Sequence, residues 1–323
     1  MTAPTPPSGD RLVAITGSSG LIGAALSEAL RGRGDQVLHL VRRAPRASGD
    51  LPHGIREARW QPGAELDPAI LDGVTGAVNL AGAGLFEGRW TDERKKELIG
   101  SRVGSTDTLA RALAAVAAQH PDREPPRLVS GSAIGIYGDQ GAAVLSEDSA
   151  QADGFVPDLV RSWEGATGPA EDAGVPVAHI RTGIVLSPRG GALSRLLPLT
   201  RAGLGGPLGG GKQYWPWITL HDHVRAMLFL LDHPDVTGPV NLTGPHPDRQ
   251  IDVVRALASE LRRPALFPAP KIAMRLVLGQ ASVEVLNSAR VLPTRLTAAG
   301  FTFDHPDLQR AAAWVVEELR WHR

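Results

Sequence analysis

Three glycines near the start of the chain have the spacing of a phosphate-binding turn. An apolar run ending at Thr16 leads into Gly17-Ser18-Ser19-Gly20-Leu21-Ile22-Gly23, and an amphipathic helical pattern follows at once. Glycines let the chain bend sharply and approach a pyrophosphate, and the first helical turn then offers free N–H groups to the anion. The alternative is a tight turn without a ligand. We predict a dinucleotide site with contacts from Thr16, Gly17, Ser19, Gly20, Leu21, Ile22 and Gly23.

The second expected strand, at 36–41, indicates which dinucleotide binds. About 20 residues after the glycine turn, NAD-binding domains carry an acid that accepts hydrogen bonds from the ribose hydroxyls. Here the strand ends in Arg42 and Arg43, Arg46 follows, and no acid is present at that strand end. A guanidinium binds the 2′-phosphate that a carboxylate would repel, so the sequence predicts NADP(H). The alternative is that these arginines are only a solvated strand end.

Strand and helix patterns alternate through the first two-thirds of the chain. This alternation predicts an α/β fold, a Rossmann type of doubly wound parallel sheet that binds ligands beyond the carboxyl ends of its strands. Further strands are expected at 55–60, 76–82, 127–132 and 177–181. Helices are expected after Gly20, at 158–172 and at 92–118, where Leu98, Val103, Leu109 and Leu113 face the sheet.

The last third of the chain breaks this alternation. It contains a glycine- and proline-rich loop at 203–211 and short, proline-rich segments beyond Pro239. A cap over the strand ends would enclose a substrate pocket. We expect residues 1–10 to be a disordered leader, 11–185 to be the Rossmann domain with 217–245 returning to it, and 186–216 with 246–323 to be the smaller substrate region.

The composition of the 323-residue chain narrows the class of partner. Its 34 basic and 34 acidic side chains balance, so neither nucleic acid nor an anionic membrane is expected. The absence of cysteine excludes disulfides, thiolate nucleophiles and cysteine metal sites. There is no run of about 18 apolar residues and no signal-peptide core, so a cytoplasmic protein with a small-molecule substrate is expected.

Motifs spread over nearly the whole chain resemble one family. They lie at 16–23, 79–82, 89–91, 101–102, 132–138, 181–186, 213–218 and 221–222, with Pro293, Arg295, Leu296, Gly300 and Phe301. Together they resemble the extended short-chain dehydrogenase/reductase superfamily, in its nucleoside-diphosphate-sugar epimerase-like branch, and there the "epimerase family protein" group with a C-terminal extension. The resemblance implies a Rossmann fold, a nicotinamide cofactor and a small C-terminal substrate domain. It also implies a homodimer through long helices such as 92–118, and cofactor contacts from Leu80, Ala81, Gly82, Ser101 and Ser130.

The proton relay usual in that superfamily is missing from this sequence. The relay needs a Ser or Thr and a Tyr-x-x-x-Lys pair, because positions i and i+4 share one face of a helix and the ammonium lowers the pKa of the phenol. Neither Tyr137 nor Tyr214 has a lysine four residues later. The family pattern places Ala133 at the hydroxyl position, and Val156 and Val160 near the positions of the tyrosine and lysine.

Ser132 and Tyr137 are the remaining candidates for catalytic hydroxyls. The pair would polarise a carbonyl, although a tyrosine with a pKa near 10 is a poor base at neutral pH. Alternatively, Ser132 satisfies a backbone group and Tyr137 packs under its loop. Arg181 ends its strand at the expected ligand edge, where it either holds an anionic substrate group or pairs with Glu164 or Asp222.

The aromatic segment after the glycine loop supplies the other substrate candidates. Tyr214 and Trp217 form a pocket wall, or else they pack in the core between the domains. His221, Asp222 and His223 invite a metal assignment, but an apolar helix face begins there and Asp222 serves that helix as a capping residue. We therefore predict no metal, and we predict that His221 contacts the cofactor or substrate.

Two functions fit these features. The first is an NADP(H)-dependent oxidoreductase or epimerase-like enzyme with an atypical active site, in which hydride passes between the nicotinamide and a carbonyl or carbinol carbon. The second is a non-catalytic, NADPH-binding redox sensor. The C-terminal pocket favours the enzyme, and the sequence leaves the substrate, the proton donor and the oligomeric state open.

Overall fold

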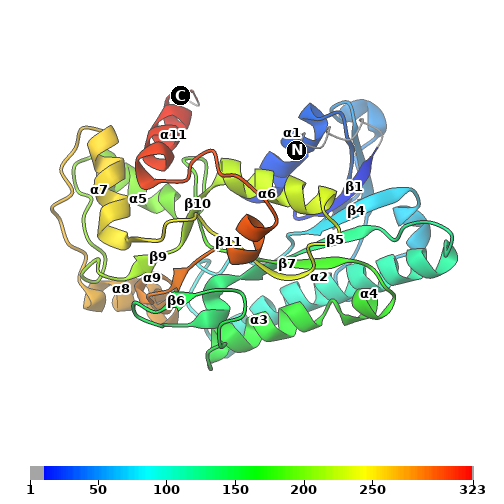
Figure 1. Cartoon of the computed structure of the whole chain (residues 1–323), viewed down its shortest axis with the longest axis horizontal. Helices are drawn as coiled ribbons and strands as arrows, with labels where there is room; N and C mark the ends of the chain where they lie inside the picture. The colour runs from blue at the N-terminus through cyan, green and yellow to red at the C-terminus, as the bar shows by residue number, and fades with distance from the viewer. Residues whose placement is uncertain (1–10, 322–323) are drawn as a thin grey trace.

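A seven-stranded sheet, parallel throughout, forms the centre of the larger part of the molecule (Figure 1). The computed structural model describes residues 11–321, apart from the side chains at 277 and 278, so the predicted leader at 1–10 lies outside the described residues. The strands are β1 (Leu12–Thr16), β2 (Gln36–Val41), β3 (Ile55–Arg59), β4 (Val74–Asn79), β5 (Arg127–Ala133), β7 (Val177–Thr182) and β11 (Gly238–Leu242). Their order across the sheet is β11-β7-β5-β4-β1-β2-β3, which confirms the predicted Rossmann-type fold.

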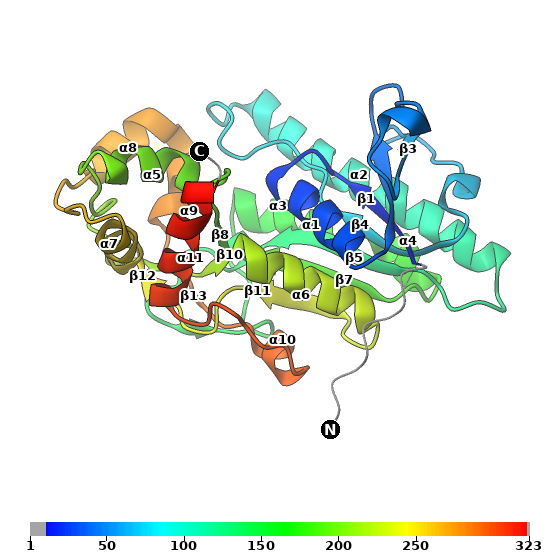
Figure 2. The same cartoon turned by 90° about the horizontal axis from the view of Figure 1, so that it is seen from above.

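Helices cover both faces of this sheet. On one face lie α1 (Leu21–Gly32) and α6 (Leu220–Asp232), and on the other lie α2 (Asp92–Gln119), α3 (Phe155–Gly165) and α4 (Gly168–Asp172) (Figures 1 and 2). In β1, Val13 and Ile15 are buried under the first layer and Ala14 under the second. Successive strand side chains point to opposite faces, so a strand covered on both sides has a continuous apolar run rather than an alternating one.

The expected helix at 158–172 is interrupted. It consists of α3 and α4, which are separated at Ala166 and Thr167. The hydroxyl of Thr167 donates to the carbonyl of Glu164 at 2.7 Å, and Pro169 has no N–H with which to continue the helical ladder. On α2, Leu98, Leu109 and Leu113 are fully buried as expected, whereas Val103 is only partly buried.

The smaller part of the molecule lies beside the carboxyl edge of the sheet and has a core of its own. Leu193, Leu197, Trp217, Leu257 and Val315 belong to that core. Its elements are α5 (Leu193–Arg201), α7 (Gln250–Glu260), α8 (Lys271–Leu278), α9 (Val283–Leu286), α11 (Leu308–Trp321) and the antiparallel pair β9 (Tyr214–Trp215) and β12 (Asp248–Arg249). We call this part the cap.

Several short elements join the cap to the larger part. The parallel pair β8 (Ile184–Leu186) and β10 (Trp217–Thr219) precedes α6, which lies over the sheet, and β11 then completes the sheet edge. A second parallel pair joins β6 (Val144–Leu145) to β13 (Arg290–Val291). The remaining elements are α10 (Thr294–Ala298) and the 3₁₀ helices η1 (Ser48–Asp50), η2 (Pro68–Leu71), η3 (Ile134–Tyr137) and η4 (Gly279–Ser282).

Candidate cofactor and substrate site

The glycine turn lies where the order of the sheet reverses. From β1 the chain continues outward to β2 and β3, and it then returns to β4 on the other side of β1. Gly17 has a φ of +67°, and a Cβ added there would lie 2.7 Å from the carbonyl carbon and oxygen of Leu80. A Cβ at Gly23 would lie 2.3 Å from the carbonyl oxygen of Gly17. These neighbours are backbone atoms, so only glycine fits at either position.

The first turn of α1 is free to receive an anion. Its N-cap is Gly20, no side chain caps it, and the first turn contains no acidic residue. Ser19 and Gly20 are exposed, and Leu21 and Ile22 are partly exposed. Unpaired N–H groups and the positive end of the helix dipole therefore face the carboxyl edge of the sheet. The residues present fit a dinucleotide pyrophosphate at this place.

Thr16 acts beneath this turn rather than in it. Its side chain is fully buried, donates to Asn79 Oδ1 at 2.6 Å, and accepts from the backbone N–H groups of Leu80 and Ala81 at 3.1 Å each. Ser130 is likewise fully buried. The expectation of cofactor contacts from these two side chains is therefore corrected, because neither has a surface that a ligand can touch. Thr16 instead fixes the loops after β1 and β4 to one another.

The loop after β4 is shaped by α2. Gly82 is exposed and Leu80 and Ala81 are partly exposed, so they line the same edge. Ser101 accepts from the N–H of Ala83 at 3.1 Å, which places it under this loop. The Arg102 guanidinium donates to the carbonyl of Ala83 at 2.9 Å, and burial lowers its pKa to about 10.

The arginines after β2 surround a carboxylate that the sequence analysis missed. Glu57 is on β3, beside β2, and its side chain is almost fully covered. Its oxygens accept two hydrogen bonds from Arg43, at 2.7 and 2.8 Å, and one from Arg46 NH2 at 2.9 Å. The hydrogen bonds from Arg43, followed by those from Arg46, hold the pKa of Glu57 well below its usual range. Arg42 is exposed and pairs with none of the described residues.

The carboxyl ends of β5 and β7 contain a buried polar network. Arg181 donates from Nε to Glu164 Oε1 at 2.8 Å and from NH2 to Oε2 at 2.9 Å. Ser132 also donates to Glu164 Oε1, at 2.5 Å. Tyr137 donates to Asn241 Oδ1 at 2.8 Å and accepts from Arg181 at 2.9 Å. Each polar group of the network thus has a partner inside the protein.

This network corrects three sequence predictions. Tyr137 is 0 % exposed, Arg181 2 % and Ser132 4 %, so their side chains are enclosed by protein and are not open to a substrate in this structure. Burial is the largest influence on Tyr137 and raises the pKa of its phenol, which further disfavours proton exchange. Arg181 pairs with Glu164, one of the two roles left open. Tyr137 packs under its loop, and Ser132 bonds a carboxylate rather than a backbone group.

The aromatic candidates also have internal partners. Trp217 is 1 % exposed, belongs to the cap core and donates from its indole to Asp248 Oδ2 at 2.9 Å, so it is not a pocket wall. Tyr214 is partly buried, with the guanidinium groups of Arg249 and Arg290 at 4.8 and 5.3 Å from its ring centroid. Of these two aromatic residues, only Tyr214 therefore remains a predicted substrate contact.

His221 lines a cavity between α1, α6 and α11. Its Nε2 lies 2.8 Å from Asp304 Oδ2, and with Asp222 these residues form the one arrangement among residues 11–321 with metal-ligand spacing. Both carboxylate oxygens of Asp222 already accept hydrogen bonds, from the backbone N–H groups of Asp304 and His305 at 3.0 and 2.9 Å. Although burial raises the pKa of Asp222, these hydrogen bonds and those from other neighbours lower it to about 2. The N-cap of α6 is Thr219 rather than Asp222.

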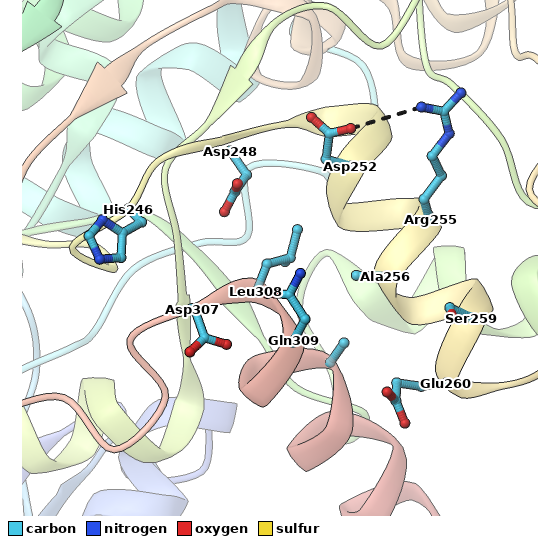
Figure 3. A pocket seen from close by; sticks show the side chains of 11 residues that line it. His246, Asp248, Asp252, Arg255, Ala256, Ser259, Glu260, Asp307, Leu308 and Gln309 are labelled. Carbon is cyan, nitrogen blue, oxygen red and sulfur yellow. Dashed lines mark ion pairs between the residues drawn. The ribbon is translucent and has the colours of Figure 1, made fainter.

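A groove of about 630 Å³ lies wholly within the cap, between α7 and α11 (Figure 3). The sequence analysis did not single it out. Asp248, Asp252, Glu260 and Asp307 line it, and Arg255 lies 4.0 Å from Asp252. Burial raises the pKa of Asp248, and the neighbouring Asp252 and Asp307 act in the same direction. The groove has an acidic lining but lies apart from the glycine turn in the chain and in the fold.

The fold and the glycine turn define a dinucleotide-binding protein of the Rossmann class. The family model described as "NAD dependent epimerase/dehydratase family" matches residues 13–243, and a domain of unknown function, DUF1731, matches residues 269–315. The chain belongs to the NAD dependent epimerase/dehydratase family, which confirms the resemblance seen in its motifs.

Relatives of known sequence and structure agree with this assignment. An epimerase family protein of Mycobacterium bovis is 40% identical over 306 residues, which cover 94% of this chain and 97% of that protein. The crystal structure of the human epimerase family protein SDR39U1 (isoform 2) with NADPH has 29% identity and a TM-score of 0.83, and covers 95% of this chain and 99% of that one. A UDP-glucuronic acid 4-epimerase from Bacillus cereus in complex with NAD, at 15% identity and TM-score 0.73, shares the fold over 96% of this chain and 99% of its own.

Proposed function

We propose that the protein is an NADP(H)-dependent oxidoreductase or epimerase-like enzyme that interconverts a carbonyl and an alcohol. The observation that carries this proposal is the glycine turn at the sheet's reversal point, where Gly17 and Gly23 admit no side chain and the first turn of α1 has no internal partner. Such a turn is needed for close approach to a pyrophosphate. The NADPH in the human relative's structure supports the same cofactor class.

The preference for the phosphorylated cofactor rests on the arginines after β2. Glu57 orients Arg43 and Arg46 and neutralises part of their charge, while Arg42 keeps its charge unpaired. The three arginines and one carboxylate leave a net positive edge, which suits a 2′-phosphate. Since a distant member of the fold binds NAD, this preference is a proposal about the residues of this chain.

The chemistry of such an enzyme has two requirements. When bound, NADPH supplies a hydride to a carbonyl carbon, and the chain must supply a proton to the carbonyl oxygen. Val156 and Val160, near the positions that the family pattern gives the tyrosine and lysine, are buried and apolar, so they move no proton. In this proposal Ser132 and Tyr137 hold Glu164 and Arg181 in place beneath the site, and the proton donor lies elsewhere.

Calorimetric titration with NADPH, NADP⁺, NADH and NAD⁺ tests the proposal. The wild type should bind the phosphorylated pair more tightly, and the double variant Arg42→Ala/Arg43→Ala should lose that preference. Arg56→Ala is the matched control, because it removes an exposed arginine from β3 that bonds Gln36 instead of Glu57. Equal affinity for all four in the wild type would contradict NADP(H) specificity. Binding of none would overturn the function.

A redox sensor is the second candidate, favoured by the valines at the relay positions. A sensor must bind NADPH and NADP⁺ with different affinities and must change shape or assembly between them. Equal affinities and unchanged small-angle scattering would exclude it. Oxidation of NADPH in a panel of carbonyl compounds and sugar nucleotides would decide for the enzyme.

Cellular location and assembly remain predictions. Among the helices within residues 11–321, none has the length and apolar character needed to cross a membrane. The cytoplasmic location rests on the sequence alone, and the homodimer through α2 rests on resemblance alone. Sedimentation velocity of the purified protein, at several concentrations, measures the second of these directly.

A further inference from the structure

One carboxyl group of the cap lies at the carboxyl end of β5, beside the turn that follows this strand. Glu284 belongs to α9, and a Cβ added to Gly135 would lie 3.5 and 3.9 Å from its two carboxylate oxygens. Gly135 is part of η3, the turn directly after β5. The same Cβ would lie 2.6 Å from Val156 Cγ1, so Glu284 and Val156 both lie beside the same face of this glycine.

The backbone around Glu284 is held firmly. The carbonyl of Val285 accepts hydrogen bonds from Trp215 Nε1 at 3.1 Å and from Gln213 Nε2 at 3.2 Å. Ser288 accepts from the N–H of Tyr214 at 3.0 Å, and its carbonyl accepts from the N–H of Gln140 at 2.8 Å. These bonds come from both the cap and the larger part, so they hold the segment that carries Glu284 beside the loop after η3.

Glu284 has no charge partner. Its side chain is partly exposed and makes no hydrogen bond or ion pair with the described residues. Val156, which lies beside the same face of Gly135, belongs to a buried apolar cluster with Ile136, Val160 and Ala281. Burial raises the pKa of Glu284 to about 7. A carboxyl group with a pKa near 7 is protonated in about half of the molecules at neutral pH, so it serves as both proton donor and proton acceptor.

We propose that Glu284, contributed by the cap, is the general acid and base that replaces the missing tyrosine and lysine. This inference rests on the proposed function. In carbonyl reduction, hydride adds to the carbonyl carbon, the C=O π electrons move to the oxygen, and the Glu284 O–H bond breaks to give that oxygen its proton. The products are the alcohol, the oxidised nicotinamide and the Glu284 carboxylate, which regains a proton from water. Alcohol oxidation is the reverse.

The test uses cofactor binding and needs no substrate. The nicotinamide ring of NADP⁺ is positively charged and that of NADPH is neutral, so a nearby carboxylate favours NADP⁺ alone. The ratio of the two dissociation constants should change by about tenfold between pH 6 and pH 8, in favour of NADP⁺ at pH 8. Titration of the 2′-phosphate affects both ligands and cancels in the ratio.

Two variants isolate the group responsible. Glu284→Gln keeps the shape and removes the charge, and it should make the ratio independent of pH. Glu260→Gln is the matched control, because it removes an exposed carboxylate from α7 of the same cap, and it should behave as wild type. A thermal melt of each variant verifies folding. Difference infrared spectra of wild type minus Glu284→Gln should show a protonated carboxyl band at pH 6 that is lost at pH 8.

The outcomes separate the two claims. If neither cofactor form binds the wild type, the proposed function fails and this inference fails with it. If both forms bind but the ratio is flat in the wild type, or still depends on pH in Glu284→Gln, only the assignment of Glu284 is overturned. Once a carbonyl substrate is found, Glu284→Gln should lower kcat by about 10²–10⁴-fold.

Discussion

Glu164 and Arg181 form a two-point ion pair inside the protein, with Oε1–Nε and Oε2–NH2 distances of 2.8 and 2.9 Å. Glu164 lies on α3 and Arg181 on β7, so the pair joins a covering helix to the sheet. Ser132 and Tyr137 complete its hydrogen bonding. Two buried charges are tolerated here because each neutralises the other and few of their polar atoms lack a hydrogen-bond partner.

Removing one member of this pair should be costly. Arg181→Met leaves the Glu164 carboxylate buried without its partner, and we expect a loss of about 3–5 kcal/mol in the free energy of unfolding. The double variant Arg181→Met/Glu164→Gln should lose clearly less than the sum of the single losses, as measured by urea denaturation. Arg111→Met, on α2, breaks only an exposed pair with Asp107 and should cost less than about 1 kcal/mol. Additive losses would show that the pair is not coupled.

Gly23→Ala should damage both the turn and the cofactor site. The added Cβ would lie 2.3 Å from the Gly17 carbonyl oxygen, so the turn must open, and we expect a loss of about 1–3 kcal/mol in stability together with weaker NADPH binding. The control is Gly32→Ala at the other end of α1, where an added Cβ meets nothing within 4 Å. That change should leave binding intact and stabilise the helix by up to about 1 kcal/mol. Equal NADPH affinities in the two variants would refute the packing argument.

Glu284 should make the fold less stable as pH rises. Its pKa is raised to about 7 from the ordinary 4.5, so its contribution is fully present below pH 4.5 and is lost as pH rises through 7. Glu284→Gln should therefore gain stability relative to wild type between pH 5 and pH 8, by about 1–3 kcal/mol because the carboxyl is partly solvated. Urea midpoints at several pH values measure this gain. A gain that does not change with pH would contradict the raised pKa.

His223 should make the fold less stable as pH falls, which is the opposite of the pH dependence expected from Glu284. It is fully buried, its Nε2 lies 3.0 Å from the Thr182 hydroxyl, and burial lowers its pKa to about 3 from 6.5. The unfolded chain binds a proton more readily, so this contribution to stability is present above pH 6.5 and is lost as pH falls toward 3.

His223→Phe removes that titration. The variant and the wild type will differ in stability at pH 7, so the comparison is of how much each loses on acidification to pH 4. The free energy of unfolding of the variant should fall less than that of wild type, and the difference should be up to about 1.4 kcal/mol per pH unit. His53→Gln, at an exposed position, should follow the wild-type curve. Parallel curves for wild type and His223→Phe would mean that His223 is protonated in the folded protein.

The sequence by itself determined the features that depend on neighbours in the chain. The turn through Gly17 and Gly23, the helix that follows it and the arginines after β2 are local, because steric limits and hydrogen bonds within a few residues decide them. Alternation of strands and helices was enough to predict the parallel sheet.

The tertiary structure alone decided which side chains meet. Glu57 reaches Arg43 because β3 lies in register beside β2, and Arg181 pairs with Glu164 rather than with a substrate because α3 packs on β5, the strand beside β7. Glu284 lies against Gly135 although most of a domain separates them in the chain. Such contacts arise from the packing of whole elements, and burial then sets which charges are paired, which stay neutral and which remain free to do chemistry.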